Sequence, residues 1–532
     1  MIRDFLDEHG LIGNSTDAEA LGMSPTVAAM LDRPLTSSPD RIAVVDRHRR
    51  ISYRDLDREV NAAAGFLASL NVRPGDRIAA TAVNSVELVT AFLAAQRIGA
   101  VWVGINRNYA PAEKRYFLED SGASLYLADR GSQEQVADGE VRTILMEPGD
   151  GRTEWSQGLV RHADARHPAM PVDPWAPAGI AYTSGTTGRP KGAVHSQHNM
   201  MVAAFMAQVM AKDRVDEIVR GMTSPMTILN MMILGTIATL SKGDRLICLD
   251  RTDARGVADW IRDERITTTT LVPTIVHDLL TRSDIDAKDL ESLDWLVVGG
   301  AMVPEGLRSL YEQRFGARLT TGYGQTEQPT AIARTHDGTP LVQGAIGRPL
   351  PHLHVAILDE EDRPVPLGDA GEICVRAAEA GPYAGIYTPT LGYWDRPEQT
   401  AKLLRNGWLH TGDIGHMDGA GDLYIHDRRS DLILRGGANV YPAEVERILR
   451  QDARVIDCAV FGLPDERLGQ SVAAVVETFE PDEAALLASV EALCADQLAR
   501  YKTPVNWRFV SALPRNTMGK VMKLELAALF KG

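Results

Sequence analysis

Residues 182–192 read Tyr182-Thr-Ser-Gly-Thr-Thr-Gly-Arg-Pro-Lys-Gly192, a segment rich in glycine, hydroxyl side chains and positive charge. Glycines let the backbone approach a ligand closely, while exposed N–H groups and hydroxyls donate hydrogen bonds to phosphate oxygens. A lysine adds charge that offsets the charge of a polyphosphate. The segment therefore predicts a polyphosphate-binding loop.

The loop does not follow the Walker A pattern, in which a Gly-Lys pair precedes Ser or Thr. Pro190 stands before Lys191, and Gly192 follows it. A solvated surface turn rich in Gly, Ser and Thr is the alternative. The neighbouring sequence favours a ligand loop, because residues 179–182 are typical of a buried strand and Ser196 is a suitable cap for a following helix.

Around this loop, short β-rich runs alternate with helical patterns, which indicates α/β units with mostly parallel sheets. Before the loop, we expect strands at 42–45, 78–81, 101–103 and 125–127, a helix capped by Ser52 and a helix over 85–98. After it, we expect strands at 246–249, 267–272, 296–298 and 318–320. The proline-rich segment 168–177 connects the two series.

From about Gly347 the pattern predicts a small antiparallel, β-barrel-like region with strands at 354–358 and 372–376, ending near His426. A smaller α+β unit follows, with helices at 442–450 and 483–498 and strands at 459–461 and 472–478. We therefore expect a large N-terminal domain over 1–427, a boundary at 428–431 and a small C-terminal domain over 432–532.

The composition excludes several classes of function. The chain has 532 residues, 44% of them hydrophobic and 24% charged, with a formal net charge of −15. More than one packed unit is expected at this length, and a negative balance without a basic block disfavours nucleic acid and anionic membranes as partners. An anionic nucleotide must then be held by local cations and a metal ion.

Cysteine spacing and terminal sequence favour a reducing, cytoplasmic location. The four cysteines are too far apart for a zinc site or a disulfide framework, and the N-terminus has no apolar signal region. The most apolar run, 226–240, is too short to span a membrane and predicts a buried helix. The cysteines are Cys248, Cys374, Cys458 and Cys494.

The loop at 182–192 resembles the phosphate-binding signature of the adenylate-forming ligases, the superfamily of acyl-CoA synthetases, luciferases and peptide-synthetase adenylation domains. The resemblance runs from about Ser38 to Lys523 through several motifs in order. It implies that the N-terminal domain binds ATP and the acyl group, and that the C-terminal domain acts as a mobile lid. The loop residues it assigns to the nucleotide are Thr183, Ser184, Gly185, Thr186, Thr187, Gly188 and Lys191.

A second motif, Gly322-Tyr-Gly-Gln-Thr-Glu327, follows the strand expected at 318–320, where α/β sheets place ligands. Tyr323 offers a flat face for a base, and Glu327 offers a carboxylate for Mg²⁺. A glycine turn with a Thr cap explains the same residues. The resemblance implies that Tyr323, Gly324 and Thr326 contact AMP and that Glu327 binds the metal; Gly300 and Ala301 resemble the segment lining the adenine and acyl pockets.

Asp413, at the end of a short β run, is able to accept both ribose hydroxyls, although such an aspartate is more often a turn former. The resemblance gives Asp413 and Arg428 contacts with the ribose. It gives Gly436 and Gly437 a place beside the pantetheine of CoA, where only small residues leave room. Ser430 occupies the family's hinge position, where Asp or Lys is common.

Lys520, in Pro514-Arg-Asn-Thr-Met-Gly-Lys520, resembles the adenylation lysine of the family. A lysine so near a chain end is usually solvated. The resemblance implies that Lys520 bridges the substrate carboxylate and the α-phosphate during adenylation, while Mg²⁺ on Glu327 holds the leaving pyrophosphate.

The acid itself is predicted from one segment. Met226, Asn230, Met231 and Leu234 fall near one helical face and are candidates for the acyl pocket, although ordinary core packing explains them equally well. The histidine that many family members carry near Pro225 is absent from 224–230. Methionines without a nearby fixed cation favour a neutral apolar acid, medium-chain aliphatic, alicyclic or aromatic.

Together these motifs predict an acyl-CoA synthetase that uses ATP, Mg²⁺ and coenzyme A and acts as a monomer or homodimer. One alternative loads an acyl-carrier protein; the end of the chain twelve residues after Lys520 favours CoA. A second alternative is an inactive nucleotide- or acyl-binding regulator, in which loss of Lys520 or Glu327 would be expected.

Overall fold

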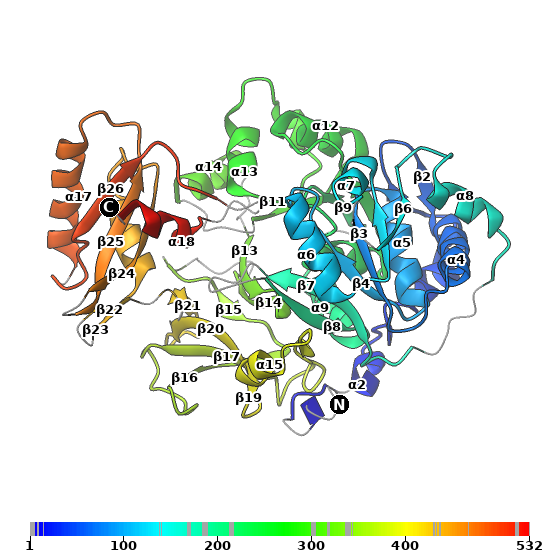
Figure 1. The fold of residues 1–532 in the computed structure, drawn as a ribbon, viewed down its shortest axis with the longest axis horizontal. Helices are drawn as coiled ribbons and strands as arrows, with labels where there is room; N and C mark the ends of the chain where they lie inside the picture. Colours follow the sequence, from blue (N-terminus) through cyan, green and yellow to red (C-terminus); the bar gives the residue numbers. More distant parts are fainter. Residues whose placement is uncertain are drawn as a thin grey trace.

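The computed structural model describes most of the chain and groups its strands into four sheets (Figure 1). The described residues are 6–7, 10–13, 15–137, 139, 141–166, 172–183, 190–211, 217–298, 305–315, 320–335, 342, 344–428, 431, 433–435, 438–465, 468–498, 500–515 and 521–530.

A seven-stranded sheet carries the predicted phosphate loop at one side. Five of its strands are parallel, and β7 and β8 form an antiparallel hairpin to which the short β18 is added. The order is β18 (Gly392–Tyr393), β8 (Lys191–Ser196), β7 (Pro177–Thr183), β4 (Val101–Gly104), β3 (Arg77–Thr81), β5 (Leu125–Ala128) and β6 (Arg142–Leu145).

A nine-stranded sheet, parallel in its centre and antiparallel at both edges, holds the second half of the nucleotide motifs. Its order is β15 (Arg348–Pro349), β14 (Gln328–Arg334), β13 (Thr320–Gln325), β12 (Trp295–Val298), β11 (Thr268–Leu271), β9 (Val219–Met222), β10 (Arg245–Cys248), β1 (Ile42–Val45) and β2 (Arg50–Ser52).

The third sheet is the expected antiparallel region, and the fourth forms the core of a small C-terminal unit (orange to red in Figure 1). The third contains β16 (Leu353–Leu358), β17 (Gly371–Ala377), β19 (Leu404–Arg405), β20 (Trp408–Met417) and β21 (Leu423–Arg428). The fourth contains β22 (Ile433–Arg435), β23 (Ala438–Val440), β24 (Asp457–Asp465), β25 (Gly469–Glu477) and β26 (Asn506–Val510). The predicted fold class is confirmed.

Local capping signals place several helices. The hydroxyl oxygens of Ser52, Ser85 and Ser196 accept backbone hydrogen bonds from Asp55, Leu88 and Asn199 at the starts of α4, α5 and α9. The helices are α2 (Ser15–Ala20), α3 (Asp32–Ser37), α4 (Tyr53–Ser69), α5 (Val86–Arg97), α6 (Pro111–Ser121), α7 (Arg130–Glu134), α8 (Glu154–Arg161), α9 (Gln197–Val209), α10 (Leu229–Met231), α11 (Ala238–Leu240), α12 (Ala254–Glu264), α13 (Pro273–Thr281), α14 (Glu305–Phe315), α15 (Pro397–Leu403), α16 (Pro442–Leu449), α17 (Glu483–Gln497) and α18 (Lys523–Leu526).

The helix expected over 226–240 begins later and is irregular. It starts at Leu229, and residues 232–237 form a π-helix between α10 and α11. Asn84 accounts for the late start, because its side chain accepts a hydrogen bond from Met226 N and donates to the carbonyls of Met222 and Ser224. These bonds hold residues 222–226 in a non-helical conformation before the helix begins.

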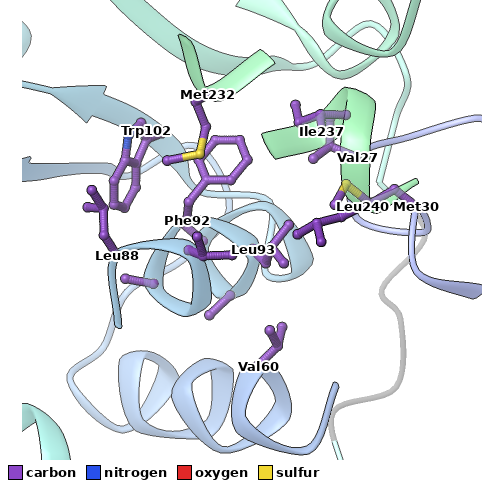
Figure 2. Packing of buried hydrophobic residues seen from close by; sticks show 14 of the residues in the cluster. Val27, Met30, Val60, Leu88, Phe92, Leu93, Trp102, Met232, Ile237 and Leu240 are labelled. Carbon is purple, nitrogen blue, oxygen red and sulfur yellow. The ribbon is translucent and has the colours of Figure 1, made fainter. Parts of the chain in front are cut away.

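α5 lies at the centre of the largest core, between α4 and the π-helix, as Figure 2 shows. All twelve residues of α5 are buried. Phe92 packs edge to face on Trp102, with ring centroids 5.6 Å apart, and Met232 of the π-helix belongs to the same cluster. The core therefore joins the seven-stranded sheet to the segment that follows Pro225.

We expect Phe92→Ala to lower the free energy of unfolding by about 3–5 kcal/mol, because truncating a fully buried ring removes its contacts and leaves a cavity. Urea unfolding measures this change. Val160→Ala is the control, since the Val160 side chain is 76% exposed, and its effect should stay within about 0.5 kcal/mol. Similar losses in both variants would contradict this account of the core.

Candidate active site

The β7–β8 hairpin presents the predicted phosphate loop from a rigid base. Thr183 pairs with Lys191 at the end of the ladder. Tyr182 donates a hydrogen bond to Asp120 (2.8 Å), and Arg396 pairs with the same carboxylate (2.5 Å). The loop residues Ser184, Gly185, Thr186, Thr187 and Gly188 lie outside the described residues. Their role in phosphate binding stays a prediction.

Tyr393 connects the hairpin to the second motif. The Lys191 ammonium lies over the Tyr393 ring, 4.7 Å from its centroid, and the Tyr393 hydroxyl donates to Glu327 Oε1 (2.6 Å). A cation and a carboxylate are thus held close together on either side of one aromatic residue. Nothing in the sequence singles out Tyr393, which is far from both partners along the chain.

Tyr323 and Asp413 meet across two sheets. The Tyr323 hydroxyl donates to Asp413 Oδ2 (2.5 Å), so the side chains predicted to contact the base and the ribose lie side by side. A charged acceptor strengthens this hydrogen bond. The pair joins β13 of the nine-stranded sheet to β20 of the third sheet.

Two local expectations about these motifs are wrong. The second motif does not follow a strand: Gly322 and Tyr323 pair with β14, and this antiparallel partner extends β13 to Gln325. Asp413 does not end a short β run, because pairing with β17 and β21 extends β20 from Trp408 to Met417. In both cases a hairpin with the next strand in sequence, β14 or β21, lengthens the strand.

A buried polar cluster fixes the segment before Asp413. His410 Nδ1 lies 3.1 Å from Glu372 Oε2, and Gly412 N donates to Glu372 Oε1 (3.0 Å). Burial raises the pKa of the Glu372 carboxyl, but the hydrogen bonds from His410 and Gly412 and the electrostatic interactions with His410 and Arg405 together hold this pKa below its usual value. Cys374 Sγ lies 3.3 Å from the same histidine nitrogen. The cluster holds Thr411 and Gly412 in place as hydrogen-bonded support for Asp413.

Many of these groups line one large cavity of about 1530 Å³, although Asp413 itself is not among the lining residues. The C-terminal unit contributes to its wall through Phe461, Arg515 and Met522. From the predicted nucleotide site, the lining includes Thr183, Lys191, Tyr323, Gly324, Thr326 and Glu327. The Glu327 carboxylate opens into this cavity beside the phosphate hairpin, and oxygen donors of this kind suit Mg²⁺. The Glu327 carboxylate therefore fits the role of a ligand for Mg²⁺.

The remaining predicted residues are only partly placed. The backbone of Arg428 pairs with Asp413. Outside the described residues lie Gly300, Ala301, Ser430, Gly436, Gly437 and Lys520. Flanking residues are described: Arg515 and Val521 form a β-bridge, and both line the cavity.

The candidate acyl residues divide into two groups. Asn230, Met231 and Leu234 line the cavity, whereas Met226 is fully buried in the core and is not among the lining residues. The sequence suggested no fixed cation near these methionines. Arg220 of β9 lines the same cavity.

Three further sequence expectations concern the cysteines, metal binding and membrane-spanning helices. The four cysteines are free and buried. Cys374, Glu372 and His410 have potential ligand atoms within 4.8 Å of one another, although the sequence suggested no metal site at a cysteine. Among the described helices, none combines the length and apolar character needed to cross a membrane.

Comparison with protein families gives two matches. The description "AMP-binding enzyme" covers residues 31–386, and "AMP-binding enzyme C-terminal domain" covers 444–520. The chain belongs to the AMP-binding enzyme family. Its predicted membership of the adenylate-forming superfamily is thereby confirmed, and its class is that of the AMP-forming acyl-CoA ligases.

Named relatives cover nearly the whole chain. A feruloyl-CoA synthase from Amycolatopsis sp is 34% identical over 93% of this chain and 96% of its own. A 3-[(3aS,4S,7aS)-7a-methyl-1,5-dioxo-octahydro-1H-inden-4-yl]propanoyl:CoA ligase from Mycobacterium tuberculosis is 35% identical, over 95% and 99%. The crystal structure of ATP-bound MatB from Rhodopseudomonas palustris superposes with a TM-score of 0.83 at 28% identity, over 95% and 99% of the two chains.

We expect Tyr323→Phe to weaken AMP binding roughly tenfold or more, because it removes a hydrogen bond to a carboxylate at the predicted ribose contact. Calorimetry with AMP measures the affinity. Tyr424→Phe is a matched control, since Tyr424 donates to Asp418 (3.1 Å) in another tyrosine–aspartate pair and neither residue lines the cavity. An unchanged affinity in Tyr323→Phe would contradict the assignment.

Proposed function

We propose that this enzyme activates an apolar carboxylic acid, medium-chain aliphatic, alicyclic or aromatic, in two steps. The acid carboxylate attacks the α-phosphorus of ATP, which forms an acyl-adenylate and releases pyrophosphate. The thiol of CoA then attacks the carbonyl carbon of this anhydride and releases AMP. The observation that carries the proposal is that Lys191, Glu327 and Tyr323 line one cavity, with Asp413 hydrogen-bonded to Tyr323.

The first step brings two anions together, so positioning and charge neutralisation supply most of the catalysis. Lys191 would offset charge on the leaving pyrophosphate, together with the hydroxyls and backbone N–H groups of 183–188. Mg²⁺ held by Glu327 would supply further positive charge at the phosphates. The position of the Lys191 ammonium against Tyr393 supports this assignment.

The nucleoside would be held by Tyr323 and Asp413. The tyrosine ring offers a face to the base, and the aspartate accepts from the ribose hydroxyls. The Tyr323 hydroxyl donates to one carboxylate oxygen of Asp413, so the two proposed nucleoside contacts lie side by side. Gly300, Ala301, Gly324, Thr326 and Arg428 complete the proposed nucleotide site.

Lys520 would bridge the substrate carboxylate and the α-phosphate. The described residues on either side of it, Arg515 and Val521, line the cavity, and this supports an approach of Lys520 to the reacting groups. In the second step, rotation about Ser430 would withdraw Lys520 and present Gly436 and Gly437 to pantetheine. Closure of the C-terminal domain, 432–532, over the N-terminal domain, 1–427, would also exclude water from the acyl-adenylate.

The proposed apolar character of the acid is inferred from the cavity wall around Met231 and Leu234. The two relatives are named for an aromatic and an alicyclic acid, and both kinds of acid fit a wall rich in methionine and alanine. A coupled pyrophosphate assay across chain length and ring type identifies the preferred acid. Pyrophosphate release without thioester formation would exclude the second step with CoA.

Two alternatives give different results in that assay. A ligase that loads a carrier protein would release pyrophosphate and form a thioester only with a phosphopantetheinylated carrier. An inactive regulator would bind AMP in calorimetry and release no pyrophosphate with any acid. Retention of Lys520 and Glu327 favours an active enzyme over the regulator.

We expect Lys520→Ala to slow pyrophosphate release roughly 10²–10³-fold, because it removes a charge aimed at the transition state. Thioester formation from supplied acyl-adenylate and CoA should be nearly unchanged. Quenched-flow measurement of each half-reaction separates the two effects, and Lys288→Ala, a change at an exposed lysine, is the control. Equal loss in both half-reactions would refute the role given to Lys520.

A further inference from the structure

Arg220 places a positive charge in the wall of the cavity, away from the residues that hold the nucleotide. It lies on β9, and its partly exposed side chain is among those lining the cavity. On the nine-stranded sheet, β9 is three strands from β13, which carries Tyr323. Neighbouring strands are about 4.8 Å apart, so the two strands are separated by roughly 14 Å.

The guanidinium of Arg220 has few partners within the protein. Its Nε donates to Thr239 Oγ1 (3.0 Å), and within the described part of the chain no carboxylate forms an ion pair with it. Burial lowers the pKa of the guanidinium to about 10, with Asp244 acting in the opposite direction, so the group stays positively charged at neutral pH. The terminal nitrogens retain hydrogen-bonding capacity toward the cavity.

Apolar side chains form much of the cavity wall to which Arg220 belongs. Ala203, Met206 and Ala207, spaced along one face of α9, line the cavity, as does Met210 just after this helix. The nine-stranded sheet contributes Trp295 and Val297 to the same wall. Strand register brings Arg220 opposite Thr268, which is itself opposite Trp295, so Arg220 and Trp295 project from the same face.

An unpaired cation in an apolar wall is costly, and a bidentate oxygen ligand offsets that cost better than any other partner. Lys191, the cation of the phosphate hairpin, is already accounted for by the proposed pyrophosphate site. Arg220 is three strands away and has no such role. Its remaining function within the cavity is to meet the far end of the acyl group.

We infer that Arg220 binds an oxygen acceptor, foremost a second carboxylate, at the end of the substrate remote from the carboxyl group that is activated. This inference rests on the proposed function and deepens it. The preferred acid would be apolar along most of its length and polar at its far end.

The test compares α,ω-dicarboxylic acids with monocarboxylic acids of the same chain length, from eight to sixteen carbons. We expect the wild-type enzyme to favour the diacid of best-fitting length roughly 10- to 100-fold in kcat/KM for pyrophosphate release. Arg220→Met should abolish or reverse this ratio while activity toward the monoacid persists. A third set of substrates consists of acids with a terminal keto group. Comparing them with the diacids shows whether Arg220 requires a carboxylate or also accepts a neutral oxygen acceptor.

Arg245→Met is the matched control, because Arg245 lies on the adjacent strand β10 and is not among the cavity residues. It should leave the ratio unchanged. Calorimetric binding of the same acids to wild type and to Arg220→Met reads out the preference without catalysis, and thermal melting checks that the variant is folded.

Equal use of diacid, keto acid and monoacid by the wild type would overturn the inference, as would a preference that survives in folded Arg220→Met. If no acid supports pyrophosphate release but calorimetry shows Arg220-dependent binding of diacids or keto acids, the proposed function fails and the Arg220 subsite stands. If acids are activated with no Arg220-dependent preference, the proposed function stands and the subsite fails.

Discussion

The main electrostatic constraint on this molecule is to hold a polyphosphate beside a carboxylate. The chain itself carries a formal net charge of −15, so its overall charge does not offset these anions. Like charges about 4 Å apart repel by roughly 4 kcal/mol at an effective dielectric constant of 20. Positive charge must therefore stand at a few defined points. Lys191 is one such point, with its backbone fixed by pairing to Thr183 and its ammonium placed over Tyr393. The Tyr393 hydroxyl holds Glu327, so the same residue positions a cation and a carboxylate.

The cavity depends on contacts between units that are distant in sequence. The Tyr323–Asp413 hydrogen bond connects the nine-stranded sheet to the antiparallel region, and the hydrogen bonds of Glu372 with His410 and Gly412 keep Asp413 in position. On the C-terminal unit, the bridge between Arg515 and Val521 flanks the segment that carries Lys520. Residues that flank both predicted catalytic loops, at 184–189 and 516–520, line one cavity. The small C-terminal unit thus completes one wall of the cavity.

Features with a local cause could be predicted from the sequence. The caps at Ser52, Ser85 and Ser196 each need one hydroxyl and a backbone N–H three residues later, and all three form. The antiparallel extensions of β13 and β20 pair with the next strands in sequence, β14 and β21, and the sequence pattern did not reveal these hairpins. Tyr393 was missed because it meets Glu327 across 66 residues of sequence. Arg220 belongs to no motif, and its strand register alone brings it into the cavity wall.

The charge of Arg220 in the cavity wall has two possible explanations, a contribution to the stability of the fold or the binding of a ligand. Replacing a buried ionic group by an apolar side chain of similar volume is often neutral or stabilising. A guanidinium whose one hydrogen bond within the described chain is to Thr239 gives the free protein little in return for its desolvation. Methionines and alanines elsewhere in the lining show that this cavity accepts apolar side chains. The charge is therefore better explained by the proposed ligand than by the fold, and under that proposal the identity of the acid would depend on β9 as well as on the segment after Pro225.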